Sequence, residues 1–260
     1  MLTKEQKSFY EHNGYVIIEN ILSNIECDFY LSNIEKFANK DYAAIMNPDR
    51  MDFLLAQSED KLRSYQNLHD KVSFIKEAKL TSQNMRNILS NAKAVEVLEK
   101  LQGNEVVGLM SQMLFKKAGT VYANQAWSPH QDNAYPKNSN GQYLTTNFFF
   151  SDANKENGSL YVYLGSHKSG LFNCKESVSY REQKGSNPGN TIDQDILNRY
   201  KRVDIEFKKG DMLVLHGNCV HGSYPNESNI SRPLFSCSYI TKGEKFIAGK
   251  NAQRREINLH

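Results

Sequence analysis

Trp127-Ser128-Pro129-His130-Gln131-Asp132 is the stretch around which the rest of the chain is organised. It places an imidazole, His130, and a carboxylate, Asp132, one residue apart. On an extended chain, residues i and i+2 point to the same face. One strand end can therefore offer a nitrogen and an oxygen ligand to a single metal ion, and the stretch predicts part of a metal site.

The remaining ligand must come from elsewhere, because a lone His-x-Asp triplet also occurs by chance. The other histidines are His12, His69, His167, His216, His221 and His260. His216 and His221 both follow a predicted buried strand, Met212 to Leu215. His221 is favoured because Gly222-Ser223 follows it directly and Arg232 lies on the next strand. Two histidines and one carboxylate form the ligand set of non-haem Fe(II) oxygenases.

Arg232 and Ser223 indicate what would bind beside that metal. Iron oxygenases of this kind use 2-oxoglutarate, whose keto acid end binds the metal and whose distal carboxylate needs a separate anchor. Arginine offers a planar fork that matches a carboxylate, and a serine hydroxyl can add a hydrogen bond. We therefore expect Arg232 and Ser223 to hold the co-substrate.

Several ordered blocks of the chain resemble the phytanoyl-CoA dioxygenase-like family of Fe(II)/2-oxoglutarate oxygenases. The blocks are the opening residues 3 to 22 with Asn13-Gly14-Tyr15, His130-Gln131-Asp132 with Tyr135, Glu156-Asn157-Gly158-Ser159-Leu160, Gly165-Ser166-His167-Lys168, Gly210-Asp211, His221-Gly222-Ser223, Asn226, Ser228 and Arg232. They span most of the chain, although residues 40 to 80 match none of them.

The resemblance implies roles for individual residues. His130, Asp132 and His221 would bind iron, while Arg232 and Ser223 would hold 2-oxoglutarate. Met113 and Asn147 stand where the family contacts the co-substrate, Asn147 in place of a frequent tryptophan. Trp127, Gln131 and Tyr135 flank the metal and would face the substrate. Asp132 argues against halogenation, because related halogenases have a small residue at that position.

The order of predicted elements places helices first and strands later. We expect helices from Thr3 to Gly14 and from Ser23 with apolar positions Ile25, Phe29, Ile34 and Phe37, then helices over 81–89 and 91–101. Strands are predicted at 15–18, 106–115, 144–150, 160–164, 203–207, 212–215 and 234–240. Residues 40–80 read as helical or irregular cover or a mobile flap, and residues 170–200 as a lid, a binding loop or small elements.

This order predicts one domain over residues 1–260, mainly β with helices. Its core would be a barrel or double sheet with packed helices. The family resemblance makes it a double-stranded β-helix, that is, a jelly-roll or cupin-like core flanked by N-terminal helices.

Composition limits the partners. A net charge of +3 gives no indication of nucleic-acid binding. No signal peptide or membrane-spanning run is present, and four cysteines without metal-type spacing favour a cytoplasmic protein. The slight positive charge favours an anionic small-molecule substrate, with Lys117 and the basic C-terminal residues as possible contacts. The oligomeric state has no signal in the sequence.

The predicted activity is hydroxylation of an unactivated C–H bond with iron, 2-oxoglutarate and dioxygen, giving succinate and carbon dioxide. Desaturation, epoxidation or ring formation would use the same cofactors. The alternative class is a cupin-like protein that binds a metal or ligand without turnover, although such a protein would have no need for the anchor at Arg232 and Ser223.

Overall fold

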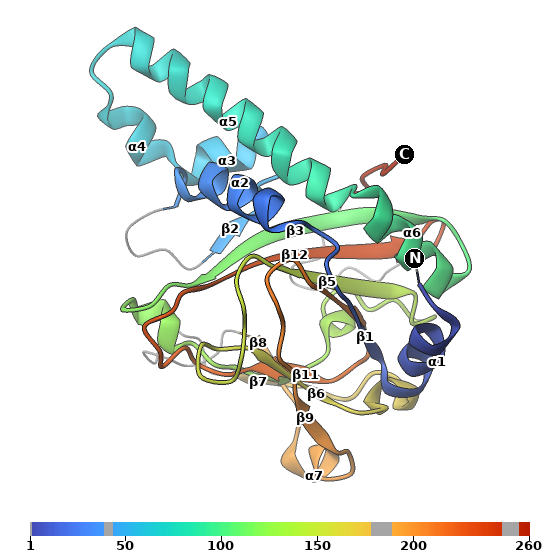
Figure 1. Ribbon diagram of the computed structural model, residues 1–260. Coiled ribbons are helices and arrows are strands. Elements are labelled where there is room, and N and C mark those ends of the chain that lie inside the picture. The colour runs from blue at the N-terminus through green and yellow to red at the C-terminus, as the bar shows by residue number, and fades with distance from the viewer. Residues whose placement is uncertain (1, 39–43, 178–188, 246–254) are drawn as a thin grey trace.

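The computed structural model describes residues 2–38, 44–177, 189–245 and 255–260. Two antiparallel sheets form its centre (Figure 1). The six-stranded sheet runs in the order β1 (Tyr15–Ile18), β10 (Met212–His216), β5 (Tyr143–Phe149), β12 (Arg232–Thr241), β3 (Val106–Lys116) and β2 (Ala44–Met46). The four-stranded sheet runs in the order β4 (Trp127–His130), β11 (His221–Ser223), β6 (Leu160–Tyr163) and β9 (Arg202–Asp204). The predicted double-sheet, jelly-roll core is confirmed.

Helices lie over the outer face of the larger sheet and at one end of the molecule. They are α1 (Lys4–Asn13), α2 (Asn24–Glu35), α3 (Met51–Gln57), α4 (Glu59–Ser64), α5 (Leu68–Leu89) and α6 (Ala92–Gln102). In Figure 1, α2, α3 and α5 lie over the β3 side of that sheet, whereas α1 and α6 lie at one end of the molecule. The helices therefore bury the outer face and leave the space between the sheets for a site.

The first two helices begin where the sequence predicts. The Thr3 side chain accepts from Gln6 in a capping box, and Gly14 ends the helix with φ +86°. Ser23 caps α2 in the same way. The predicted apolar face of α2 was wrong, because Ile25 is 82% exposed. At 100° per residue, Ile25 lies opposite the buried Ile34, so the two cannot share a face.

Residues 44–80 form mainly helical cover, and residues 40–43 lie outside the described residues. The predicted helix over 81–89 is only the end of α5, which begins at Leu68. Asn67 caps it by accepting from the Asp70 amide. The buried positions Phe74, Ala78, Thr81, Met85 and Ile88 recur at spacings of three and four, the stripe of an amphipathic helix.

The long stretch after β6 carries small elements of its own. These are the pair β7 (Lys175–Ser177) and β8 (Gly189–Thr191) and the short α7 (Gln194–Leu197). Residues 178–188 lie outside the described residues. The Ile192 amide donates to the Pro129 carbonyl at 3.1 Å, so this stretch packs against the metal-ligand strand. The predicted strand 203–207 is shorter than expected, because Phe207 makes only an isolated bridge with Ala153.

Three further short 3₁₀ helices connect the strands, η1 (Val121–Asn124), η2 (Asp132–Ala134) and η3 (Ser166–Ser169). Among the described residues, no helix is both long and apolar enough to cross a bilayer.

Candidate active site

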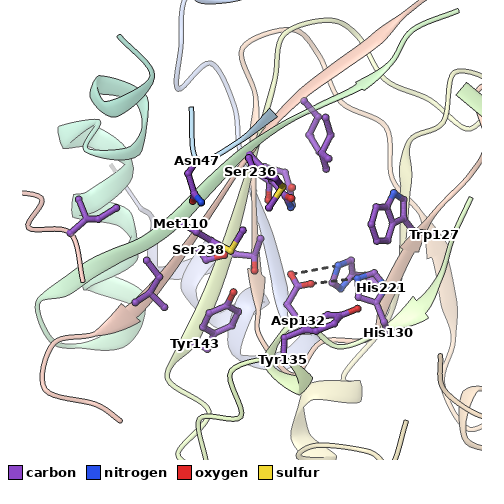
Figure 2. Close-up of a pocket in the computed structure, with 18 of the residues that line it drawn as sticks. Asn47, Met110, Trp127, His130, Asp132, Tyr135, Tyr143, His221, Ser236 and Ser238 are labelled. Carbon is purple, nitrogen blue, oxygen red and sulfur yellow. Dashed lines mark ion pairs between the residues drawn. The ribbon is translucent and has the colours of Figure 1, made fainter. Parts of the chain in front are cut away.

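Three side chains converge between the sheets. His130 ends β4, His221 begins β11, and the two residues are register partners. Asp132 begins η2 immediately after β4. Its Oδ1 lies 3.4 Å from His130 Nε2 and its Oδ2 lies 3.7 Å from His221 Nε2 (Figure 2). Within the described parts of the chain, no other group of three histidines, cysteines or carboxylates is placed to hold a metal.

The backbone orients both imidazoles. His130 Nδ1 lies 2.8 Å from the Ser128 carbonyl, and His221 Nδ1 lies 3.0 Å from the Cys219 carbonyl. A carbonyl only accepts, so each Nδ1 carries the proton and each Nε2 keeps its lone pair. Those lone pairs are the ones that face Asp132, and such outer hydrogen bonds are typical of metal-binding histidines.

The electrostatics of the three groups are coupled. Burial raises the pKa of Asp132, but the charge of His221 and the hydrogen bond with His130 that arise when these imidazoles are protonated outweigh it, and the net shift is downward. Burial lowers the pKa of His130, but the hydrogen bond and charge of Asp132 reverse that shift and the net pKa is raised. The pKa of His221 stays lowered, mainly by burial. Asp132 is thus an anion, and its negative charge favours a cation beside it.

Gly222 allows β11 to approach its neighbours closely. A Cβ at this position would lie 2.5 Å from the Trp127 carbonyl and would also meet the Tyr161 hydroxyl. The tight fit keeps β11 beside β4 and holds His221 next to His130. Two imidazole nitrogens and one carboxylate facing a cavity fit the three-ligand face expected for Fe(II).

A cavity of about 1060 Å³ opens from these ligands. Trp127 and Tyr135 line it beside the metal ligands, as predicted for substrate-facing residues (Figure 2). Alternate residues of three strands of the larger sheet form its other wall, namely Met110, Gln112 and Leu114 of β3, Leu234, Ser236 and Ser238 of β12, and Thr145 and Asn147 of β5. Asn147 therefore lies in the cavity, where the predicted co-substrate contact requires it.

The predicted co-substrate anchor also lies in this cavity. Ser223 ends β11 and Arg232 begins β12, and both line it. Arg232 is 2% exposed, and its Nε and Nη1 have no hydrogen-bond partner among the described residues. Burial lowers the pKa of Arg232 to about 10. A buried guanidinium with two nitrogens that lack an acceptor indicates that an anion belongs beside it.

Two predicted contacts are contradicted by the side-chain directions. Met113 is fully buried in the core beneath the helices, because it alternates with the cavity-facing Gln112 and Leu114. Gln131 is also fully buried and does not line the cavity. Its Nε2 donates to the carbonyls of Gly170 and Asn218, both at 2.7 Å, and its Oε1 accepts from the Phe172 amide at 2.8 Å. Gln131 therefore ties the 170–172 segment to the metal-ligand segment.

The other histidine considered as a ligand lies elsewhere. The ring of His216 packs 5.0 Å from that of His167, and its Nδ1 accepts from the Asn218 amide. Burial lowers the pKa of His216 to about 4. Its Nδ1 is engaged with the backbone and its ring packs against Tyr10 of α1 and against His167, so His216 belongs to the packing around α1.

Several site residues had not been predicted. Lys116 is fully buried and donates to Ser223 Oγ at 2.8 Å. The sequence suggested that the strand ended at Phe115, although extending its alternation by one residue would have placed Lys116 on the cavity side. Arg50 and Arg86 line the cavity from the helical cover. They carry no motif and come together only because α3 and α5 pack side by side.

Comparisons with known proteins agree with this geometry. The family model described as phytanoyl-CoA dioxygenase (PhyH) matches residues 10–234. Phytanoyl-CoA dioxygenase 1 of Oryza sativa subsp. japonica is 26% identical over 293 residues, covering 98% of this chain and 95% of that protein. The epimerase SnoN, solved in complex with Fe3+, alpha ketoglutarate and nogalamycin RO, has a TM-score of 0.67 at 18% identity, covering 94% of this chain and 85% of SnoN. The carbocyclase SnoK has a TM-score of 0.66 at 19% identity, covering 97% of this chain and 89% of SnoK.

Proposed function

Because the chain belongs to the phytanoyl-CoA dioxygenase (PhyH) family, we propose that it hydroxylates an unactivated C–H bond of a small molecule. It is a 2-oxoglutarate-dependent non-haem iron oxygenase. In the balanced reaction, the C–H compound, 2-oxoglutarate and dioxygen give the alcohol, succinate and carbon dioxide. The observation that carries the proposal is the presence of three convergent ligands and an unpartnered buried arginine in one cavity.

The roles of the residues follow from their contacts. His130, Asp132 and His221 would hold iron, and Arg232 with Ser223 would hold the distal carboxylate of 2-oxoglutarate. Dioxygen is the oxidant for cleavage of the C–H bond, 2-oxoglutarate is the electron donor that is oxidised to succinate and carbon dioxide, and the bound iron would couple the two oxidations. Asn147 lines the same cavity, and its side-chain amide would contact the co-substrate.

Trp127 and Tyr135 are placed to position the substrate beside the metal ligands. The apolar side chains of Leu109, Met110 and Leu234 line the same cavity and would exclude water from the reacting carbon. The carboxylate of Asp132 occupies the position that a halide would need. SnoN and SnoK share this fold and carry out other reactions, so the outcome depends on which C–H bond is placed beside the iron.

We further propose that the substrate is anionic. Arg50, Arg86 and Arg255 line the cavity, and its acidic lining residues are the metal ligand Asp132 and Glu256. Arg50 is paired with Asp52 at 2.7 Å; for Arg86, no ion pair is found within the described residues. Lys117, considered as a contact from the sequence, is exposed and does not line the cavity. The arginines on α3 and α5 are therefore the better candidates for the anionic end of the substrate.

The first test is anaerobic addition of Fe(II) and 2-oxoglutarate to the metal-free protein. A weak visible charge-transfer band should form and should be absent in His130→Ala and Asp132→Ala. In air, succinate should accumulate when the protein is supplied with compounds from a metabolite panel. If wild type forms no band and releases no succinate, the proposed chemistry is wrong.

Mass spectrometry of the product separates the possible outcomes. Hydroxylation adds one oxygen atom, desaturation or ring closure removes two hydrogens, and epimerisation leaves the mass unchanged. Within the panel, anionic compounds should stimulate succinate release more than neutral analogues, and Arg86→Gln should reduce that preference. An unchanged preference in Arg86→Gln would contradict the anionic assignment.

The alternative class is a binding protein that holds metal and ligand without turnover. It would bind a metal but would give neither the charge-transfer band with 2-oxoglutarate nor succinate with any panel member. The buried Arg232 argues against this reading, because a binder without a co-substrate has no need for an unpaired guanidinium in its cavity.

A further inference from the structure

Two buried cations stand opposite each other at one end of the cavity. Lys116 ends β3, Arg232 begins β12, and the two are register partners. Like charges directly opposite on neighbouring strands are unfavourable, and burying an unpaired cation is costly. Among the described residues, no carboxylate contributes to the electrostatic surroundings of either side chain. Burial and the charge of Arg232 lower the pKa of Lys116 well below its usual value, and an anion bound beside the two side chains would favour the protonated form of Lys116. Among the described residues, this end of the cavity has no negative charge to balance these two basic groups.

The hydrogen bonds of Lys116 direct its amino group towards Ser223. Its Nζ donates to Ser223 Oγ at 2.8 Å and also to the Tyr224 carbonyl. An ammonium group only donates, so Ser223 Oγ must accept from Lys116, and its own proton is free to be donated elsewhere. Ser223 lines the cavity, and so does Arg232 with its unpartnered Nε and Nη1. The result is a set of donors without an acceptor.

The fold leaves room for the Lys116 side chain. A Cβ at Gly158 would lie 2.7 Å from Lys116 Cδ and 3.0 Å from the Tyr224 carbonyl, and Gly158 has φ +89°. The Lys116 carbonyl accepts from Asn226 Nδ2 at 2.8 Å, which fixes the backbone at the end of β3. Backbone and side chain of Lys116 are therefore both held in place, with the ammonium group directed at Ser223.

We propose that Lys116 is a positioning residue of the co-substrate site, acting through Ser223. By donating to Ser223 Oγ, it makes that hydroxyl a donor to the distal carboxylate of 2-oxoglutarate. Its charge, added to that of Arg232, makes this end of the cavity select 2-oxo acids that carry a second carboxylate. The inference rests on the proposed use of 2-oxoglutarate.

The test compares Lys116→Met, which keeps most of the unbranched side chain and removes its amino group and charge, with Lys117→Met. Lys117 is the exposed neighbour, so the control makes the same chemical change one residue away. Binding of 2-oxoglutarate and of 2-oxopentanoate, which lacks the distal carboxylate, is measured anaerobically by calorimetry with Fe(II) present. Lys116→Met should weaken 2-oxoglutarate binding by about 10- to 100-fold, because hydrogen bonds to charged groups are lost. Binding of 2-oxopentanoate should be unchanged in both variants, and Lys116→Arg should recover most of the affinity.

Ser223→Ala provides a second test that does not depend on the folding of a Lys116 variant. It should weaken 2-oxoglutarate binding selectively, and adding Lys116→Met to it should have a smaller effect than in wild type. The proposal is overturned if Ser223→Ala or a folded Lys116→Met keeps wild-type affinity for 2-oxoglutarate. It is also overturned if Lys116→Met weakens both acids equally, which would indicate a structural role. If wild type itself does not bind 2-oxoglutarate, it is the proposed function that fails.

Discussion

Replacing Arg232 with methionine should have opposite effects on stability and on co-substrate binding. Arg232 is 2% exposed and has two unpartnered nitrogens, with the buried Lys116 opposite it. Methionine keeps most of the apolar stem and removes the charge. In the protein without metal and co-substrate, Arg232→Met should therefore raise the free energy of unfolding, because an unbalanced charge no longer has to be buried.

The size of that cost follows from the pKa of Arg232. Burial lowers this pKa from 12.5 to about 10. One pH unit corresponds to about 1.4 kcal/mol, so the buried charge disfavours folding by on the order of 3 kcal/mol. The group is protonated in both states at neutral pH, so this penalty is present throughout the range below pH 10. After some loss of packing, we expect Arg232→Met to raise the free energy of unfolding by about 1–3 kcal/mol.

Co-substrate binding should change in the other direction. Loss of a bidentate, charge-assisted contact should weaken 2-oxoglutarate binding by about 100-fold or more. Wild type should gain about 2.7 kcal/mol of stability when 2-oxoglutarate is present at 100 times its dissociation constant. Arg232→Met should gain almost none at the same concentration.

Urea unfolding measures both effects, first without metal and co-substrate and then anaerobically with Fe(II) and 2-oxoglutarate. Arg199→Met, at an exposed arginine, is the matched control and should behave as wild type in both conditions. A metal-free Arg232→Met protein less stable than wild type would mean that the guanidinium is satisfied by the protein itself. Full stabilisation of this variant by 2-oxoglutarate would remove Arg232 from the co-substrate site.

Three further changes test other parts of the structure. Burial lowers the pKa of His216 from 6.5 to about 4, so the unfolded state binds more protons between these pH values, and the free energy of unfolding should fall by about 3 kcal/mol as the pH drops from 6.5 to 4. His216→Gln should reduce that fall in urea unfolding. An unaltered pH dependence in this variant would rule out His216 as the source of the fall. Gln131→Leu removes three buried hydrogen bonds and should lower the free energy of unfolding by about 2–4 kcal/mol. It should not alter which compounds of the metabolite panel cause succinate release. A changed substrate selectivity at unchanged stability would show that Gln131 contacts the substrate. Gly222→Ala would place a Cβ 2.5 Å from the Trp127 carbonyl and so displace the neighbouring His221. Fe(II) binding, measured by a competitive metal titration, should weaken by about 10- to 100-fold. If the variant kept the metal affinity of wild type, β11 would be able to shift without affecting the metal ligands.

Local chemistry explains why much of the fold was predictable. Thr3 with Gln6, Ser23 and Gly14 determine where helices begin and end through contacts within a few residues. Helix α5 was only partly recognised, because its first half carries widely spaced apolar residues among many charges. Packing against α2 and α3 stabilises that half, and such contacts are not present in the local sequence.

The sequence by itself was enough to predict the candidate metal ligands and the candidate arginine anchor, because these depend on residue type, order and spacing along strands. Only the tertiary structure decided which way the β3 side chains face. Both faces of β3 are covered, one by helices and one by the cavity, so apolar residues occur on both faces and do not show which set of alternating side chains faces the cavity. The register with β12 placed Lys116 beside Arg232 and Ser223 and directed Met113 into the core. The His130–Asp132 pair is a metal site only because the pairing of β4 with β11 brings His221 beside it.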